Sequence, residues 1–216
     1  MFDDLVERYD LLNDLLSFGM DRWWRRAAAR AVRVRPGDVA LDLGCGTGKL
    51  GALISDRARV VGVDVSHAML VRARSGAAGR MTLVEGSAFG LPFAVGTFDA
   101  AVSGFVLRNL EDLGAAFVEL ARVVRPGGAI ALVDITEPGH PVVRRIFDAY
   151  FRTAAPALGS LVGKRRAYSY LVRSLAQLPP PPVTCAMLAA AGFEDCHAKP
   201  LTGGIATLFT GRRLVG

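Results

Sequence analysis

The residues with the most distinctive chemistry form the tract Leu41-Asp42-Leu43-Gly44-Cys45-Gly46-Thr47-Gly48. Three glycines stand at every second position, Gly44, Gly46 and Gly48, and the acid Asp42 precedes them. Glycine lacks a Cβ atom, so a backbone rich in glycine can approach a ligand closely. The carboxylate of Asp42 can meet a positively charged group of that ligand, directly or through ordered water. The tract therefore predicts a binding site for a small molecule.

Three classes of ligand use such a turn, and the neighbouring residues separate them. The dinucleotide pattern G-x-G-x-x-G, started at Gly44, requires a third glycine where this chain has Lys49. The phosphate-binding pattern G-x-x-x-x-G-K-[ST] fails because Leu43 replaces its first glycine and Leu50 its hydroxyl residue. An acid followed by G-x-G-x-G suits S-adenosylmethionine, which has no phosphate but carries an amino-acid tail and a sulfonium cation.

A second acid, Asp64, supports a nucleoside ligand. It ends the second predicted strand, 20 residues after Gly44. A carboxylate at this place in an α/β sheet accepts hydrogen bonds from ribose hydroxyls. A glycine turn or an acid at a strand end is common by itself, but the two together favour an S-adenosylmethionine site.

Apolar runs that alternate with helical periodicity predict the elements that position these residues. The expected strands are 39–43, 60–63, 81–85, 98–103, 129–133, 193–198 and 205–211. The expected helices between the first five strands are 49–56, 67–75 and 112–124. Continuous apolar strands separated by helices are typical of a parallel sheet covered on both faces. The predicted fold class is α/β, a Rossmann-like, mostly parallel sheet of seven strands with an antiparallel edge strand and helices on both faces.

Helical segments flank this core. Residues 1–35 predict two helices that form an N-terminal lid, with Tyr9 over the cofactor to exclude water. A first helix packed permanently against the core is the alternative. Residues 136–182 lack a strand pattern and predict a helical cap over the acceptor pocket, before the last two strands. The whole chain, 1–216, is expected to be a single domain.

Composition limits the class of protein. The 216 residues are 51% hydrophobic and 21% charged, which fits one globular domain. No run approaches the ~20 apolar residues of a membrane span, and no secretory signal is visible. Three cysteines fit a reducing cytoplasm, which is the expected location. The three histidines have no second ligand at metal spacing, so no metal site is expected.

The net charge of +6 has two interpretations. The excess basic residues cluster in 22–35, 144–152 and 164–166. They form either a solvated surface or one that attracts anionic lipid headgroups or nucleic acid. Basic residues are not interleaved with aromatic ones, as a nucleic-acid stacking platform would require, so nucleic acid is not an expected partner.

Several further tracts resemble the ubiquinone/menaquinone biosynthesis C-methyltransferase family. They are Tyr9-Asp10-Leu11-Leu12-Asn13-Asp14-Leu15-Leu16-Ser17-Phe18-Gly19, Leu91-Pro92-Phe93, Leu107-Arg108-Asn109, Arg122-Val123-Val124-Arg125-Pro126-Gly127-Gly128, Tyr168-Ser169-Tyr170-Leu171 and Leu201-Thr202-Gly203-Gly204-Ile205-Ala206. The resemblance spans nearly the whole chain and implies a class I methyltransferase dependent on S-adenosyl-L-methionine. It also implies the reaction, methylation of a ring carbon of a prenylated quinol in menaquinone or ubiquinone biosynthesis.

The resemblance implies further site residues. Matched by position, it places Thr47 and Asp64 on the cofactor and Ser87 and Ala88 against the adenine. It adds Ser103 at the end of the fourth strand as another cofactor residue. Ser87 and Ser103 also fit the reading of ordinary turn residues.

The chain departs from the family pattern at several places. Lys49 stands where the family usually has Asp, and Val106 replaces the glycine of a Phe-Gly-Leu-Arg-Asn tract. Arg173 replaces an acidic residue, and Arg212-Arg213 replaces an aromatic-Lys ending. These changes leave the predicted cofactor site intact but put the identity of the acceptor in doubt.

Arg108 and Asn109 are the candidate catalytic residues. A quinol carbon becomes nucleophilic when the neighbouring hydroxyl ionises, and the pKa of a phenol in water is about 10. Arg108 follows the fourth strand at the expected site and can stabilise the oxyanion or polarise a water. Asn109 can orient the same group. The alternative is a salt-bridge arginine beside a helix cap.

Other functions fit parts of the sequence. One is a C- or O-methyltransferase for another aromatic or polyketide small molecule in specialised metabolism. Others are an RNA methyltransferase, favoured only by the positive charge, and a non-catalytic cofactor-binding or assembly subunit. The prenylated acceptor predicts weak, peripheral membrane association, and a homodimer is carried as a further hypothesis.

Overall fold

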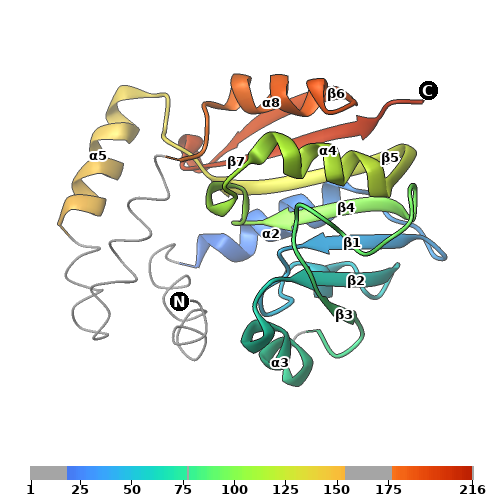
Figure 1. Ribbon diagram of the computed structural model, residues 1–216. Helices are drawn as coiled ribbons and strands as arrows, with labels where there is room; N and C mark the ends of the chain where they lie inside the picture. Colours follow the sequence, from blue (N-terminus) through green and yellow to red (C-terminus); the bar gives the residue numbers. More distant parts are fainter. Residues whose placement is uncertain (1–18, 77, 154–176, 216) are drawn as a thin grey trace.

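The computed structural model describes residues 19–76, 78–153 and 177–215 (Figure 1). The predicted first helix, including Tyr9, lies outside the described residues, and so do residues 154–176 of the predicted cap. The lid and the cap are therefore described only in part.

Seven strands form one sheet in the order β3-β2-β1-β4-β5-β7-β6. Their bounds are β1 (Val39–Leu43), β2 (Arg59–Asp64), β3 (Thr82–Glu85), β4 (Phe98–Gly104), β5 (Val124–Ile135), β6 (Phe193–Leu201) and β7 (Ala206–Arg213). The first five strands pair parallel with one another. This confirms the predicted α/β sheet, and the order reverses beside β1, where such folds bind their ligands.

The strand register brings the predicted site residues to one edge of the sheet. Asp42 of β1 is level with Gly62 of β2 and Val102 of β4. Asp64, two residues further along β2, is level with Glu85 at the end of β3. Because parallel strands end at the same edge, the glycine turn after β1 and the acid after β2 lie side by side.

The antiparallel pairing is located at the other side of the sheet. β7 pairs antiparallel with β5 on one side and with β6 on the other. The last strand in sequence is therefore inserted between two earlier ones, and β6 is the edge strand. This is how the predicted antiparallel edge is built.

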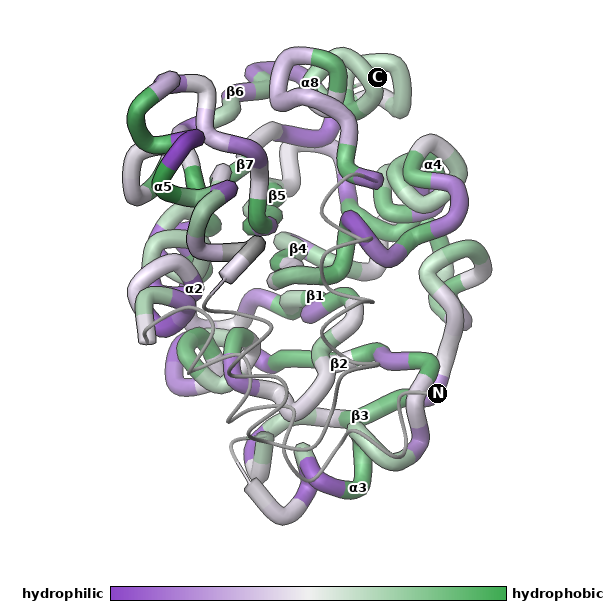
Figure 2. Tube along the Cα trace, turned by 90° about the vertical axis from the view of Figure 1, so that its left-hand side faces the viewer, coloured by the Kyte–Doolittle hydropathy of each residue, from purple (hydrophilic) through white to green (hydrophobic). Residues whose placement is uncertain are grey.

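Helices cover both faces of the sheet (Figure 2). The helices are α2 (Met20–Ala31), α3 (His67–Ser75), α4 (Leu113–Val123), α5 (Pro141–Arg152) and α8 (Pro181–Ala190). On one face Trp24 and Ala28 of α2 are buried in one apolar core. On the other face Phe117 and Leu120 of α4 and Leu188 of α8 are buried in a second core. Two apolar cores on opposite faces explain why strands of the sheet are continuously apolar.

Side chains at the helix starts fix where helices begin. The Oδ1 atom of Asp112 accepts a hydrogen bond from the amide of Ala115 at 2.9 Å, and Ser66 caps α3 in the same way through Met69. Pro181 opens α8, as expected for a first-turn proline whose missing N–H would have no helical partner. Pro181 and Pro182 are thus the first two residues of this helix.

The helix predicted over 49–56 is wrong. The structure has a 3-10 turn, η2 (Gly51–Leu53), in its place. The amide of Gly51 donates to Oδ2 of Asp42 at 2.8 Å, so it is not available for the helical bond to the residue four positions earlier. Two other 3-10 turns, η3 (Leu107–Asn109) and η4 (Thr202–Gly204), follow β4 and β6. Among the described residues, no helix has the length and apolar content needed to cross a bilayer.

Candidate active site

The glycine turn after β1 depends on left-handed backbone. Gly44, Gly46 and Gly48 have φ angles of 64°, 52° and 78°. Residues with a Cβ atom adopt this region only at a cost of about 1–2 kcal/mol each. Three glycines at alternate positions therefore allow a tight turn that few other sequences can form.

The space around the three glycines differs. A Cβ on Gly44 would lie 2.4 Å from a methyl carbon of Val106, and one on Gly48 would lie 2.5 Å from the Cβ of Ala78. A Cβ on Gly46 would meet nothing within 4 Å among the described residues. Gly44 and Gly48 are thus held by close packing, whereas the backbone of Gly46 faces open space that a ligand can approach.

Asp64 joins the turn to the end of β2. Its Oδ2 accepts a hydrogen bond from the amide of Gly46 at 2.8 Å, and its Oδ1 accepts one from the amide of Ser66 at 2.9 Å. Burial raises the pKa of this carboxyl, and the two amide bonds oppose the increase. Each carboxylate oxygen can accept a second hydrogen bond. The carboxylate is therefore held in place with accepting capacity left for two adjacent hydroxyls.

Asp42 is a buried acid with one oxygen that the protein does not satisfy. Its side chain is 1% exposed, and its Oδ2 accepts from Gly51. Its Oδ1 has no hydrogen-bond partner among the described residues. Burial raises the pKa of Asp42 to about 7, although the Gly51 amide and the Arg25 charge act in the opposite direction. A buried acceptor without a partner is costly, so this oxygen is suited to a cationic donor on a ligand.

A cavity at the carboxyl edge of the sheet brings these groups together. Its walls come from the ends of β1, β2 and β4 and from α2. Of the predicted site residues, those that line it are Asp42, Gly44, Gly46, Thr47, Asp64 and Asn109. Both acids and the open Gly46 thus face one space, as a zwitterionic nucleoside ligand requires.

The remaining predicted cofactor residues that the structure describes do not line the cavity. Ser103 is fully buried, and its hydroxyl donates to the carbonyl of Leu43 at 2.7 Å, which ties the end of β1 to β4. Ser87 is exposed just beyond β3, and its Oγ accepts from the amide of Phe89 at 3.2 Å. Ala88 is partly buried against the core of the α4 face. Gly48 packs behind the turn, as described above. Their contact with a cofactor stays a prediction.

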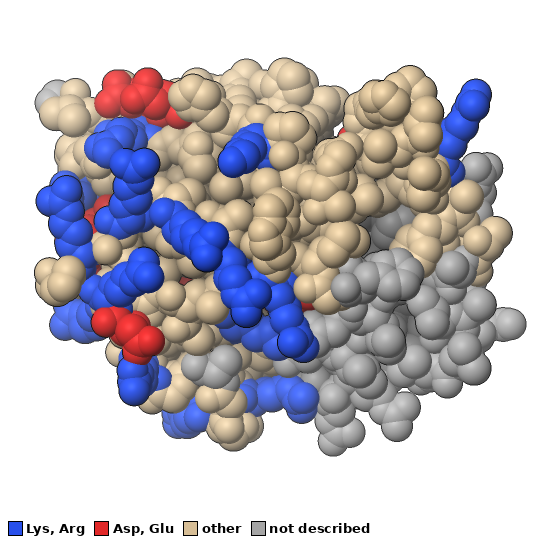
Figure 3. Space-filling model, turned by 180° about the vertical axis from the view of Figure 1, so that it is seen from behind, with Lys and Arg blue, Asp and Glu red and all other residues tan. Residues whose placement is uncertain are grey.

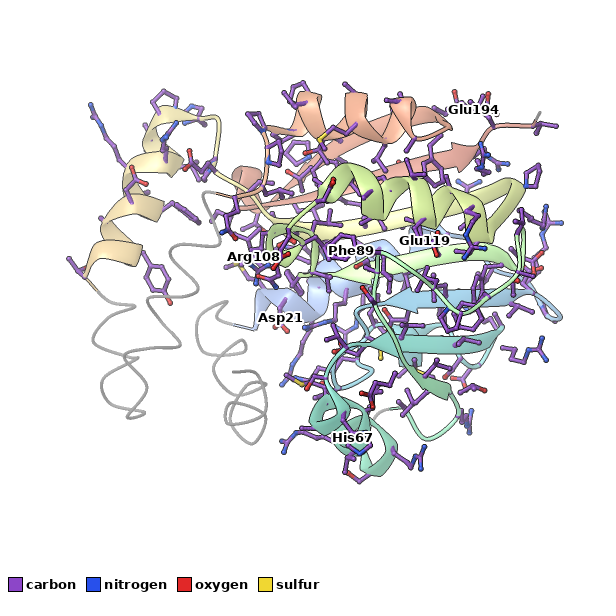
Figure 4. The ribbon with its side chains drawn as sticks, viewed as in Figure 1. Asp21, His67, Phe89, Arg108, Glu119 and Glu194 are labelled. Atoms are coloured by element: carbon purple, nitrogen blue, oxygen red, sulfur yellow. The ribbon has the colours of Figure 1, made fainter. Side chains whose placement is uncertain are left out.

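Arg108 lies at this end of the sheet, near the start of α2 (Figure 4). Its guanidinium forms an ion pair with Asp134, and the two side chains are 4% and 0% exposed. Asp134 also accepts from the backbone amide of Arg108 at 3.1 Å. The salt bridge is therefore a buried one that fixes η3 to the end of β5. Asn109, next to it, lines the cavity and donates from Nδ2 to the carbonyl of Phe105 at 3.2 Å.

Phe105 directly follows β4, lines the cavity and contacts α2. It adopts a left-handed φ of 65°, which is strained for a residue with a Cβ atom. The Arg25 guanidinium lies 4.9 Å from the centre of its ring, within range of a cation–π interaction. Arg25 also pairs with Asp21 and lines the cavity.

Arg25 is a site residue that the sequence reading missed. It belongs to the basic cluster 22–35, which predicts a surface position, but it is only 9% exposed and Trp24 beside it is 1% exposed. The signal was present in the helical spacing, since Asp21, Trp24, Arg25 and Ala28 share one face of α2. Lys49 also lines the cavity, so its departure from the family pattern concerns the site itself.

Cys45 in the glycine turn is not suited to act as a nucleophile. Its side chain is buried, and a Cβ on Gly62 would lie 2.9 Å from its sulfur. Burial raises the pKa of this thiol, and the charges of Asp42 and Asp64 raise it further. A thiol in this state is the unreactive form. Among the described residues, no group of three or more His, Cys, Asp or Glu side chains is placed to hold a metal ion.

The sheet order, the left-handed glycine turn and the two acids at the strand ends together define a class I methyltransferase. A solved SAM-dependent methyltransferase from Thermotoga maritima has the same fold, with a TM-score of 0.67 and 16% identity over 98% of this chain and 97% of that one. The profile of the ubiE/COQ5 methyltransferase family matches residues 1–213, and the chain belongs to this family.

Curated relatives agree with this assignment. The chain is 39% identical to the "Ubiquinone/menaquinone biosynthesis C-methyltransferase UbiE" of Syntrophotalea carbinolica, over 99% of this chain and 92% of that protein. It is 40% identical to the "Demethylmenaquinone methyltransferase" of Mycolicibacterium vanbaalenii, over 96% and 91%. The predicted family and enzyme class are confirmed.

Proposed function

We propose that this enzyme transfers the methyl group of S-adenosylmethionine to a ring carbon of a prenylated quinol. The main support for S-adenosylmethionine as the cofactor is the pair of acids around the glycine turn. The most telling atom is Oδ1 of Asp42, which has no hydrogen-bond partner among the described residues. The names of the curated relatives support the quinol acceptor and the place in quinone biosynthesis.

The cavity offers a partner for each polar part of this cofactor. Asp42 would accept the ammonium group of the methionine tail, and Asp64 the two ribose hydroxyls. The open backbone at Gly46 would lie against the ligand, with Thr47 beside it. Ser87 and Ala88 would contact the adenine, and Tyr9 would cover the bound cofactor. The bound cofactor supplies an electrophilic methyl group.

The protein must then make the acceptor carbon nucleophilic. A quinol hydroxyl loses its proton near about pH 10 in water, so positive charge and hydrogen-bond donors at the site would favour its ionised form at neutral pH. Arg25 and Lys49 line the cavity and would supply this positive charge. Asn109 is placed to orient the hydroxyl, whereas Arg108 would act through its charge and by holding η3. The hydroxyl proton would pass to water, and the proton of the methylated ring carbon would then return to the oxygen, which restores the aromatic hydroxyl.

The proposal is tested by methyl transfer in vitro to a panel of short-tailed naphthoquinols, benzoquinols and soluble phenols, followed by mass spectrometry. We expect C-methylation of a quinol that carries a prenyl tail. Asn109→Ala should lower kcat at least ten-fold with cofactor affinity within a few-fold, and Arg108→Lys, which keeps the charge beside Asp134, should lose less activity than Arg108→Gln.

Two results would contradict the proposal. Transfer only to soluble phenols would assign the enzyme to other aromatic metabolites. Cofactor binding without transfer to any acceptor would favour a non-catalytic subunit. In cells, a strain lacking the protein should accumulate a quinone short of one methyl group.

A further inference from the structure

The outer side of α2 and the neighbouring antiparallel strands share a cluster of exposed cations. We call this cluster the basic face; it consists of Arg26, Arg30 and Arg33 with Lys199 of β6 and Arg212 of β7. Seen from behind, Lys and Arg side chains form a band from the left edge to about the middle of the molecule, with fewer acidic ones beside it (Figure 3). Residues far apart in the sequence thus form one positively charged surface.

These cations are not neutralised by the part of the chain that the structure describes. Arg26, Arg30, Arg33 and Lys199 form no ion pair with any described residue. Surface arginines elsewhere do pair, for example Arg80 with Asp56. A set of uncompensated cations on one face produces a positive potential that attracts anions.

A groove lined by both apolar and charged residues runs through the basic face. It lies between α2 and the strands β6 and β7, and Ala27, Ala31 and Leu208 are among the residues that line it. Trp23 stands at the same groove with 51% of its surface exposed. The described residues that line the groove include one acid, Asp195, and four cations, Arg30, Arg33, Lys199 and Arg212. The surface therefore combines net positive charge, apolar area and an exposed indole.

We propose that the basic face binds the anionic phospholipid headgroups of a bilayer surface. Each cation near an anionic membrane favours binding, and a tryptophan side chain is stable where its apolar ring meets headgroups while its N–H stays hydrated. Arg26 and Arg30 are one helical turn apart, so they project in the same direction from α2. The purpose of this binding rests on the proposed function, because a prenylated acceptor partitions into membrane.

A bilayer fits this surface better than a nucleic acid. Single-stranded nucleic acid is bound by several aromatic side chains that stack on successive bases along a basic groove. The basic face has one exposed aromatic residue, Trp23, among the described residues that line its groove. Headgroup phosphates need no stacking partners, only a broad positive surface.

The same helix connects the basic face to the active site. Its inner side carries Trp24, whose Nε1 donates to Thr202 at 2.9 Å, and Arg25, which lines the cofactor cavity. Binding through the outer side of α2 would therefore hold the cavity close to the membrane surface from which the acceptor comes.

The test is sedimentation of the full chain with vesicles of phosphatidylglycerol and phosphatidylcholine in equal parts, compared with phosphatidylcholine alone. We expect binding to the anionic vesicles only, and release in 0.5 M NaCl because salt screens exposed charges. The double variant Arg26→Gln/Arg30→Gln should lower the partition coefficient about 30-fold, which is roughly five-fold for each cation.

A control variant has the same loss of net charge at the other end of the sheet, where one of the two cations, Arg80, is paired with Asp56. Arg74→Gln/Arg80→Gln removes two exposed cations near α3 and should keep vesicle binding within about three-fold of the unaltered protein. Both doubles should methylate a short-tailed quinol in detergent at the normal rate, which separates this inference from the proposed function. Absence of binding to anionic vesicles, equal losses in both doubles, or tight binding of transfer RNA without vesicle binding would each overturn it.

Discussion

Asp42 should make cofactor affinity depend on pH. Its raised pKa of about 7 means that the carboxyl is mostly protonated at pH 6 and mostly ionised at pH 7.5. The ammonium group of the cofactor selects the ionised form, because a cation next to a carboxylate lowers the pKa of that carboxyl. Binding therefore releases a proton at low pH, and the affinity decreases as the pH falls through the pKa of the free protein.

The size of this effect follows from the pKa. For a group that titrates near 7 in the free protein and well below 6 in the complex, the dissociation constant increases about eight-fold between pH 7.5 and pH 6. Higher pH is avoided, since an α-amino group itself loses its proton near about 8. Isothermal titration calorimetry with S-adenosylhomocysteine, in buffers of different ionisation enthalpy, measures both the affinity and the proton released.

Two variants identify the titrating group. Asp42→Asn should bind more weakly at pH 7.5 and show an affinity independent of pH over this range. Asp64→Asn should weaken binding but keep the pH dependence, since the Asp42 carboxyl remains. If the dependence persists in Asp42→Asn and disappears in Asp64→Asn, or if the unaltered protein shows none, the assignment of the ammonium group to Asp42 is wrong.

The turn and its supports give three further predictions. Gly44→Ala should raise the cofactor dissociation constant more than ten-fold, because the new Cβ would lie 2.4 Å from Val106 and the backbone there is left-handed. The double variant Gly44→Ala/Val106→Gly should recover part of the affinity, as measured by calorimetry. No recovery would show that the contact with Val106 is not the cause of the loss. Asp134→Asn should lower the free energy of unfolding in urea by about 3–5 kcal/mol, because it leaves the buried charge of Arg108 without its counterion; a loss below about 1 kcal/mol would mean that the pair contributes little. Trp24→Phe should lower the free energy of unfolding by about 1–2 kcal/mol in the same assay, because it removes the hydrogen bond to the hydroxyl of Thr202 and leaves a smaller ring. An unchanged unfolding midpoint would contradict this.

The parts of the fold that could be predicted from the sequence depend on local patterns. Continuous apolar strands bounded by glycine or acid identify a buried parallel sheet, and the spacing of Gly44, Gly46 and Gly48 identifies the turn. Asp64 could be placed beside that turn because parallel strands end at one edge of the sheet. These features need only the chain direction and the period of the side chains.

The rest depends on contacts between distant segments. The amide of Gly51 bonds to Asp42, which shortens an expected helix to one 3-10 turn. Arg25 is buried against the ring of Phe105, 80 residues later in the sequence, although composition alone places an arginine at the surface. Arg108 finds its counterion on β5, 26 residues later. No local pattern contains the partner in any of these cases.

The position of β7 has a consequence for synthesis on the ribosome. β5 ends at Ile135, but the strand that covers its free side begins only at Ala206, about 70 residues later. At 5–20 residues per second, the apolar edge of β5 waits roughly 4–14 seconds for its neighbour. An open strand edge is a template for pairing with other chains. The nascent protein therefore passes through an interval of exposure to aggregation, which ends when β7 pairs with β5.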